Sequence, residues 1–188
     1  MNDENFTINL ERYKIAIEAR HKLNDDFHKW MTFYYVANGA ILISLNAVYQ
    51  KNIVDNDSLL LLSLLGIITS ILWNFSCKGY YYWSSNWIKL IKKFEKEVYG
   101  DKLVYGFFSN EVKEGEKLIF YPFASKNIST PKLTMLFSLI SIISWTSYSV
   151  YIVEEIWCKI LLIVIVLLIY FILPIFVKSR KDGQHQLV

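Results

Sequence analysis

The sequence predicts an all-α membrane protein with four transmembrane helices, and two observations support this fold class. First, 54% of the 188 residues are hydrophobic, which is more than a soluble domain of this size usually contains. Second, the chain has four long apolar stretches, and a helix needs roughly 20 such residues to cross a bilayer core about 30 Å thick. The stretches are Thr32–Tyr49, Ser58–Cys77, Leu133–Val153 and Ile156–Val177.

These stretches divide the chain into five segments without an internal repeat or a low-complexity linker, so we expect one domain. Two transmembrane hairpins, 32–77 and 133–177, alternate with an N-terminal helix at 1–31, a segment at 78–132 and a tail at 178–188. No proline occurs between Ser58 and Val98. This predicts one long helix that leaves the membrane and ends at Gly100.

The loop region after this long helix has weaker signals. Two short aromatic and β-branched runs, Leu103–Phe108 and Leu118–Phe123, flank a polar stretch, which predicts a small β-hairpin. Further along, Ser129 and Thr130 precede Pro131, a pattern typical of a helix start. The third transmembrane helix is therefore expected to begin at this proline.

The placement of lysine and arginine predicts the orientation, because loops rich in these residues stay on the cytoplasmic side. Of the 20 such residues, five precede the first stretch, ten lie in 78–132, three lie in the tail, and two (Lys51 and Lys159) lie elsewhere. The short connections between paired stretches carry acids instead, namely Asp55, Asp57, Glu154 and Glu155. We therefore expect both termini and the 78–132 segment to be cytoplasmic.

The cysteines and the N-terminal residues bear on the compartment. Cys77 and Cys158 fall near opposite faces of the membrane, so we expect both thiols to be free. No apolar core of a cleavable signal peptide precedes Thr32. Together with the lack of a disulfide framework, these features predict a protein of the bacterial inner membrane.

Small and hydroxylated residues mark the faces through which helices associate in lipid. The residues that we select as pore-lining or helix-packing are Asn38, Asn46, Thr134, Ser138, Ser141 and Ser144. Packing within a helical bundle is the commoner role of such residues, and a water-filled axis formed by several copies is the alternative. The second stretch carries a similar set, namely Ser63, Gly66, Ser70, Asn74 and Cys77. The fourth stretch has long apolar side chains and is expected to face lipid.

The exit of the second stretch combines aromatic and basic residues. We select Trp83, Trp87, Lys89, Lys92 and Lys93 as a candidate ligand-binding surface. Lysines neutralise phosphates while aromatic rings stack on bases, so the expected ligand is a nucleotide or a single-stranded nucleic acid, with a cytoplasmic protein as the other candidate partner. The alternative is that each aromatic residue, considered by itself, belongs to an interfacial aromatic belt at the membrane surface. The apolar face of this helix is expected to bury against the N-terminal helix or a neighbouring subunit.

The sequence contains no recognisable catalytic or cofactor site. It has no phosphate-binding glycine loop, zinc-binding spacing or nucleophile elbow, and Lys159 is the only charged residue within the four stretches. His21, Asp25 and His28 share a helix face, yet a solvated face explains three such residues better than a metal ion does. We expect no enzyme activity, cofactor or metal. The expected partners are the lipid bilayer and further copies of the chain.

The exit of the second stretch resembles the RipA family of bacterial inner-membrane proteins. In that family an apolar span runs into a Trp-x-x-Asn-Trp segment and then into an amphipathic helix that ends in acids. The matching residues here are Trp83, Asn86, Trp87, Leu90, Ile91 and Glu95. The lead-in to the first stretch, from Tyr13 to Trp30, is also similar. The resemblance implies a homo-oligomeric ring whose cytoplasmic helices form a shared collar, and it implies no known reaction.

The small size, the four spans and the polar third span are also similar to the membrane effectors of Hailong-type antiphage defence. In such systems a nucleotidyltransferase makes a nucleic-acid ligand that controls a membrane channel. This similarity implies an oligomeric channel-type effector controlled from the cytoplasm, which is our leading functional hypothesis. The alternative is a RipA-like structural scaffold without a conducting pore.

Overall fold

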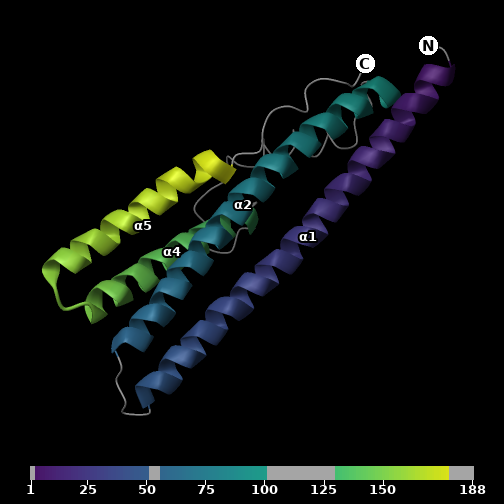
Figure 1. Ribbon diagram of the computed structural model, residues 1–188. Coiled ribbons are helices and arrows are strands. Elements are labelled where there is room, and N and C mark those ends of the chain that lie inside the picture. The colour runs from purple at the N-terminus through teal and green to yellow at the C-terminus, as the bar shows by residue number, and fades with distance from the viewer. Residues whose placement is uncertain (1–2, 51–55, 101–129, 178–188) are drawn as a thin grey trace, which may run out of the picture. The chain divides into compact units, whose positions relative to one another are not determined.

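The computed structural model describes residues 3–50, 56–100 and 130–177. They form four α-helices, which are α1 (Asp3–Gln50), α2 (Asn56–Tyr99), α4 (Thr130–Ile152) and α5 (Ile156–Val177) (Figure 1). Each helix is long and apolar enough to cross a membrane, in agreement with the four predicted spans. No strand occurs among the described residues, and the predicted hairpin at Leu103–Phe108 and Leu118–Phe123 lies outside them.

Helix α1 joins two predicted elements into one helix of 48 residues. The expected N-terminal helix and the expected first span are continuous, because no proline interrupts them and their polar residues do not compete with the helical hydrogen bonds. The hydroxyl of Thr32 donates to the carbonyl of His28 at 3.0 Å, and that of Ser44 donates to the carbonyl of Ala40 at 2.9 Å. Hydroxyls bonded in this way stay within their own helix and place few demands on its surroundings.

Helix α2 is also continuous over 44 residues, which confirms the predicted long helix beyond the second span. It ends at Gly100, whose φ of 65° lies in the left-handed region that glycine adopts at low cost. The N–H of Gly100 donates to the carbonyl of Lys96 at 3.0 Å. This is the last i→i−4 hydrogen bond of α2, and the positive φ of Gly100 ends the helix after it.

Helices α4 and α5 form the C-terminal hairpin. Helix α4 begins at Thr130 with Pro131 in its first turn, as the sequence predicts, because proline has no N–H to lose at that position. A connection at 153–155 follows α4, and α5 then starts at Ile156. Helix α5 is the most hydrophobic of the four and α1 the least, judged by their most apolar windows.

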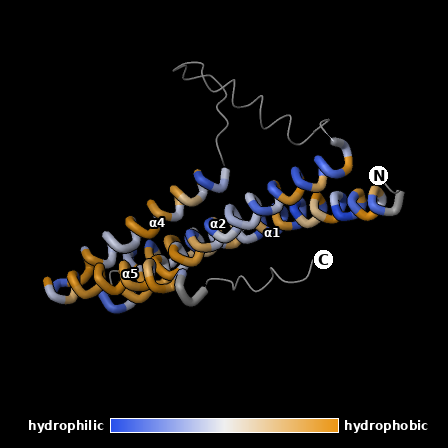
Figure 2. Tube along the Cα trace, turned by 90° about the horizontal axis from the view of Figure 1, so that it is seen from above, coloured by the Kyte–Doolittle hydropathy of each residue, from blue (hydrophilic) through white to orange (hydrophobic). Residues whose placement is uncertain are grey.

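The chain divides into two units, and α1, α2 and α4 each contribute to both of them. Unit 1 comprises Met1–Thr32 and Ser76–Met135, and unit 2 comprises Phe33–Phe75 and Leu136–Val188. Figure 2 shows that hydrophilic residues gather in the N-terminal part of α1 and the C-terminal part of α2, whereas hydrophobic residues predominate along α4 and α5.

In unit 1, α1 and α2 pair through aromatic contacts. The ring of Tyr80 stacks on that of Phe27 with 3.9 Å between centroids, and its hydroxyl donates to Oδ1 of Asn24 at 2.9 Å. Tyr13 and Tyr99 meet edge to face at 5.9 Å. The pairing is antiparallel, because residues early in α1 meet residues late in α2.

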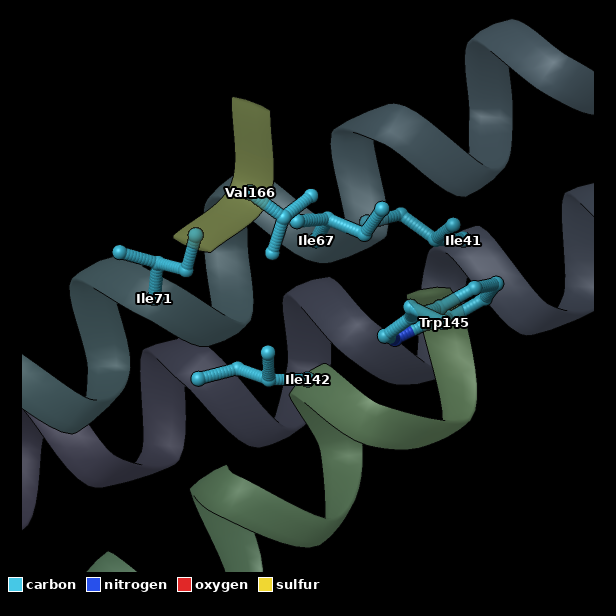
Figure 3. Packing of buried hydrophobic residues seen from close by; sticks show 6 residues of the cluster. All are labelled: Ile41, Ile67, Ile71, Ile142, Trp145 and Val166. Carbon is cyan, nitrogen blue, oxygen red and sulfur yellow. The ribbon is translucent and has the colours of Figure 1, made fainter. Parts of the chain in front are cut away.

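In unit 2, all four helices contribute to one hydrophobic core. Its buried members are Ile41 from α1, Ile67 and Ile71 from α2, Ile142 and Trp145 from α4, and Val166 from α5 (Figure 3). Helix α2 is the most enclosed, since 44% of its membrane-length window is buried, against 6% for α5. Helix α5 therefore covers one side of the core and leaves most of its apolar surface exposed, as predicted for a lipid-facing helix.

Gly66 of α2 sets the closest approach between α2 and α4. A Cβ atom built at this position would lie 2.5 Å from Cε2 and 2.9 Å from Cε3 of Trp145, and it would also overlap Cδ2. Real Cβ atoms essentially never come so close to another heavy atom. The indole therefore rests directly on the backbone of α2, and only glycine leaves room for it.

We expect Gly66→Ala to destabilise unit 2 by about 1–3 kcal/mol, the usual cost of overpacking a filled core. The measurement is the free energy of unfolding by denaturant titration in detergent micelles. Gly79→Ala is the matched control, because a Cβ at Gly79 meets nothing within 4 Å and alanine favours helix over glycine. An equal loss in both variants would contradict the role assigned to Trp145.

Candidate functional site: a polar network that joins four helices

The side chain of Asn38 lies at the centre of a buried polar network in unit 2. Asn38 is 9% exposed, and its Nδ2 donates to the carbonyl of Tyr34 in the preceding turn at 2.9 Å. Its Oδ1 faces α2 and α4. Trp145 Nε1 donates to this oxygen at 3.0 Å, and the hydroxyls of Ser70 and Ser141 lie 3.2 Å and 3.3 Å from it.

The two serine hydroxyls near Asn38 also hydrogen-bond to each other. Ser70 Oγ and Ser141 Oγ are 2.7 Å apart, so one of them donates to the other. The carboxamide oxygen of Asn38 has two lone pairs, one of which accepts the indole hydrogen of Trp145. The second lone pair accepts from the remaining serine. The indole hydrogen and both hydroxyl hydrogens of this group therefore have acceptors within the chain.

A second branch of the network extends from Asn74 of α2. Its Nδ2 donates to Ser138 Oγ of α4 at 2.8 Å, and its Oδ1 accepts from the hydroxyl of Tyr170 of α5 at 3.1 Å. Nearer the other end of α2, Ser149 Oγ donates to Ser63 Oγ at 2.8 Å. Ser63 itself donates to the carbonyl of Leu60 at 2.8 Å.

The network has a structural role that follows from the solvent of the helices. Lipid tails offer no hydrogen-bond partners, so a polar group buried in a membrane span must find a partner inside the protein or in trapped water. Ser63, Ser70, Asn74, Ser138 and Ser149 are completely buried, and each bonds another side chain. These bonds join α2 to α1, α4 and α5, and they favour one arrangement of the four helices.

The residues predicted as pore-lining or helix-packing do not form a single face. Asn38, Ser138 and Ser141 belong to the network, so for these three residues the structure shows packing within one chain. Thr134 lies in unit 1, where it is buried and donates to the carbonyl of Thr130 at 2.8 Å. Asn46 and Ser144 are exposed on the outside of unit 2.

Two members of the network, Trp145 and Tyr170, were not anticipated from the sequence. Each is an aromatic residue with a polar atom in an otherwise apolar span, and such atoms usually find a partner when buried. The contact face of α2 also has a regular spacing. Ser63, Ser70 and Cys77 recur every seven residues and are completely buried, which is the repeat expected of two helices that coil around each other.

The predicted ligand-binding surface lies on α2 in unit 1, and the structure divides it between helix faces. Tyr82, Lys89, Lys93 and Lys96 are exposed and fall on one face at helical spacing, which we call the basic stripe. Trp83 is 48% exposed and Trp87 is half-buried, and both lie on the adjoining face. Lys92 is half-buried and lies off the stripe.

The apolar face predicted on this part of α2 is only partly covered within the chain. Ile91 is completely buried, and so is Glu95, one turn further along. Trp83 remains about half exposed, and Leu90 and Phe94 are half-buried. The N-terminal helix therefore covers one edge of this face and leaves the edge near Trp83 accessible.

No metal site or disulfide emerges from the described part of the chain. It contains no group of three or more His, Cys, Asp or Glu side chains that could hold a metal ion, and His21, Asp25 and His28 are not brought together as ligands. Cys77 is buried, with its Sγ 3.7 Å from Sδ of Met31, and Cys158 is exposed. Both thiols are free.

Four membrane-length helices joined by a buried polar network define this chain as a multi-pass α-helical membrane protein. Comparison with known families then shows where it belongs. Residues 10–179 match the octameric membrane protein family (8xMP), and because this match spans most of the chain, the protein is a member of that family. The comparisons with curated proteins and with solved structures give no match.

Membership of this family supports the predicted self-association in a membrane. It does not bear on the resemblance to RipA or to Hailong-type effectors, which stays a prediction.

We expect Asn38→Leu to lower the free energy of unfolding by about 1–2 kcal/mol, because Trp145 Nε1 and one serine hydroxyl lose their acceptor in a buried site. Denaturant titration in micelles measures this loss. Asn5→Leu makes the same chemical change at an exposed position of α1 outside unit 2 and should leave unfolding nearly unchanged. Parental stability in Asn38→Leu would show that the Asn38 contacts are not needed for packing.

Proposed function

We propose that the protein is a homo-octameric channel-type effector of the bacterial inner membrane, controlled from the cytoplasm by a nucleotide or a single-stranded nucleic acid and acting in antiphage defence. The lysine and arginine distribution supports a cytoplasmic position for both termini and for the 78–132 segment. Self-association, which the family supports, is the first requirement of a pore built from several copies.

The observation that carries the proposal is the continuity of α2. One uninterrupted helix contains Ser70 and Asn74 of the buried network and, further along, the exposed basic stripe. A ligand bound to the stripe would therefore act on the same helix that holds the membrane core together. This is the physical link that control from the cytoplasm needs.

The chemistry of the stripe favours a phosphate-bearing ligand. Lys89, Lys93 and Lys96 are exposed and outnumber the one exposed acid on that face, Glu97, so together they attract an anion. The exposed rings of Tyr82 and Trp83 lie next to them and can stack on bases. Regularly spaced lysines beside exposed rings therefore suit a phosphate-bearing ligand better than a protein partner.

The conducting path that we propose runs between copies. The hydroxyls of Ser138 and Ser141 are paired inside one chain, so they are not available to line water. The polar groups left on the outside of unit 2 include Asn46 and Ser144. A shared axis would have to draw on such outward groups.

The test is ion flux through liposomes that contain the purified protein, with single-stranded DNA oligonucleotides or ATP added on the side of the basic stripe. We expect the added ligand to change flux. We also expect Lys89→Glu, Lys93→Glu and Lys96→Glu together to weaken binding at least about ten-fold and to lower the salt dependence by about 2 in log–log slope. Arg12→Glu, Lys14→Glu and Lys22→Glu reverse three exposed charges of α1 and should bind like the parent.

The outcomes separate the two parts of the proposal. Flux that is insensitive to both ligands and to the triple substitution would leave a channel without the proposed control, and a protein partner would replace the ligand. No flux under any condition would reject the channel. The RipA-like scaffold without a conducting pore would then be preferred, in keeping with the fully paired interior of unit 2.

A further inference from the structure

One face of α1 in unit 2 is left uncovered by the rest of the chain. Val36, Ala40, Ile43 and Ala47 fall on this face at helical spacing, and we call it the α1 outer face. All four are exposed, with Val36 at 66% and Ile43 at 73%. The opposite face of α1 carries Tyr34, Asn38 and Ile41, which are buried against the other helices.

The α1 outer face differs in composition from the exposed surface of α5. The exposed residues of α5 are mostly long and apolar, for example Leu161, Leu168 and Phe171, and such side chains are well solvated by lipid tails. The α1 outer face instead has two alanines, and exposed Ser44 and Asn46 lie on either side of it. Of the four helices, α1 is also the least hydrophobic and α5 the most.

The space beside this face is open. A Cβ atom built at Gly39, next to Ala40, would meet nothing within 4 Å, in contrast to Gly66, whose place beside Trp145 is filled. A glycine and two alanines on an exposed helix surface allow the backbone of another helix to come close, which is how helices associate in a membrane. The amide of Asn46 at the flank would gain hydrogen-bond partners that lipid does not provide.

We infer that the α1 outer face is the surface through which one copy of this chain packs against another copy in the assembly, while α5 faces lipid. The family supports self-association in a membrane, which requires a surface shared between copies. The α1 outer face combines small side chains, flanking polar groups and open space. Helix α4 also exposes Ser144 and Ser147, but long or bulky side chains such as Ile140, Ile143 and Tyr151 surround them and keep a neighbouring backbone at a distance. The inference goes beyond the proposed function, because it holds whether or not the assembly conducts ions.

Substitution by a bulky side chain tests the assignment directly. We expect Ala40→Trp and Ala47→Trp to abolish most of the oligomer, because tryptophan keeps two helices apart. Val164→Trp and Leu168→Trp place the same side chain on exposed positions of α5 and should leave the copy number unchanged. Native mass spectrometry in detergent gives the copy number, and circular dichroism confirms that each variant keeps its helical content.

Retention of the full copy number by both α1 variants would overturn the inference. So would dissociation of the α5 variants, since that would place the contact between copies on α5. These results do not depend on ion flux or ligand binding, so a failure here is distinguishable from a failure of the proposed function.

A milder probe covers the case in which the tryptophan variants do not fold. A nitroxide spin label is attached at Ala40→Cys or at Val164→Cys, with Cys77→Ala and Cys158→Ser removing the native thiols. In bilayers, lipid-soluble oxygen should collide with the label at position 40 several-fold less often than with the label at position 164. Equal collision rates would show that the α1 outer face is open to lipid, and the inference would be wrong.

Discussion

The hydrogen bonds to the carboxamide oxygen of Asn38 are the interaction on which the membrane core depends. This single oxygen accepts the indole hydrogen of Trp145 in α4 and lies within 3.3 Å of serine hydroxyls from α2 and α4. In lipid no water competes for these donors, so an arrangement that separates them leaves polar groups without partners. Apolar packing around Ile67 and Ile142 can adapt to small shifts of the helices, whereas the Asn38 contacts require one particular alignment.

The sequence predicted the helices well and their contacts less well. Apolar stretches of sufficient length identified four spans, and the lack of proline between Ser58 and Val98 predicted the continuity of α2. The sequence could not predict which hydroxyls are buried in the network and which are exposed. Ser141 belongs to the network and Ser144 does not, although the two are less than one helical turn apart. Which side of α4 faces α2 depends on a contact between distant residues, that of Trp145 with Gly66, and no local pattern encodes it.

Burial within one chain assigns different surroundings to the helices of unit 2. Helix α2 is the most enclosed of the four, and its buried polar residues bond to side chains of α1, α4 and α5. Helix α5 is almost entirely apolar and mostly uncovered, as expected of a helix solvated by lipid. Helix α1 contributes Asn38 to the interior yet exposes small residues on its other side. A membrane protein that self-associates needs such asymmetry, since a chain equally apolar on all sides would have no preferred partner surface.

The seat of Trp145 on the backbone of Gly66 also limits how the helices of unit 2 can move. The indole of Trp145 occupies the space that the side chain of any residue other than glycine would fill at position 66. If α4 slid along α2 by one helical turn, about 5.4 Å, the ring would collide with the α2 side chains on either side of Gly66. The hydrogen bonds of Ser138 with Asn74 and of Ser149 with Ser63 lie on either side of the indole, so tilting α4 about the ring would stretch at least one of them. Helices α2 and α4 are therefore expected to move as one rigid pair.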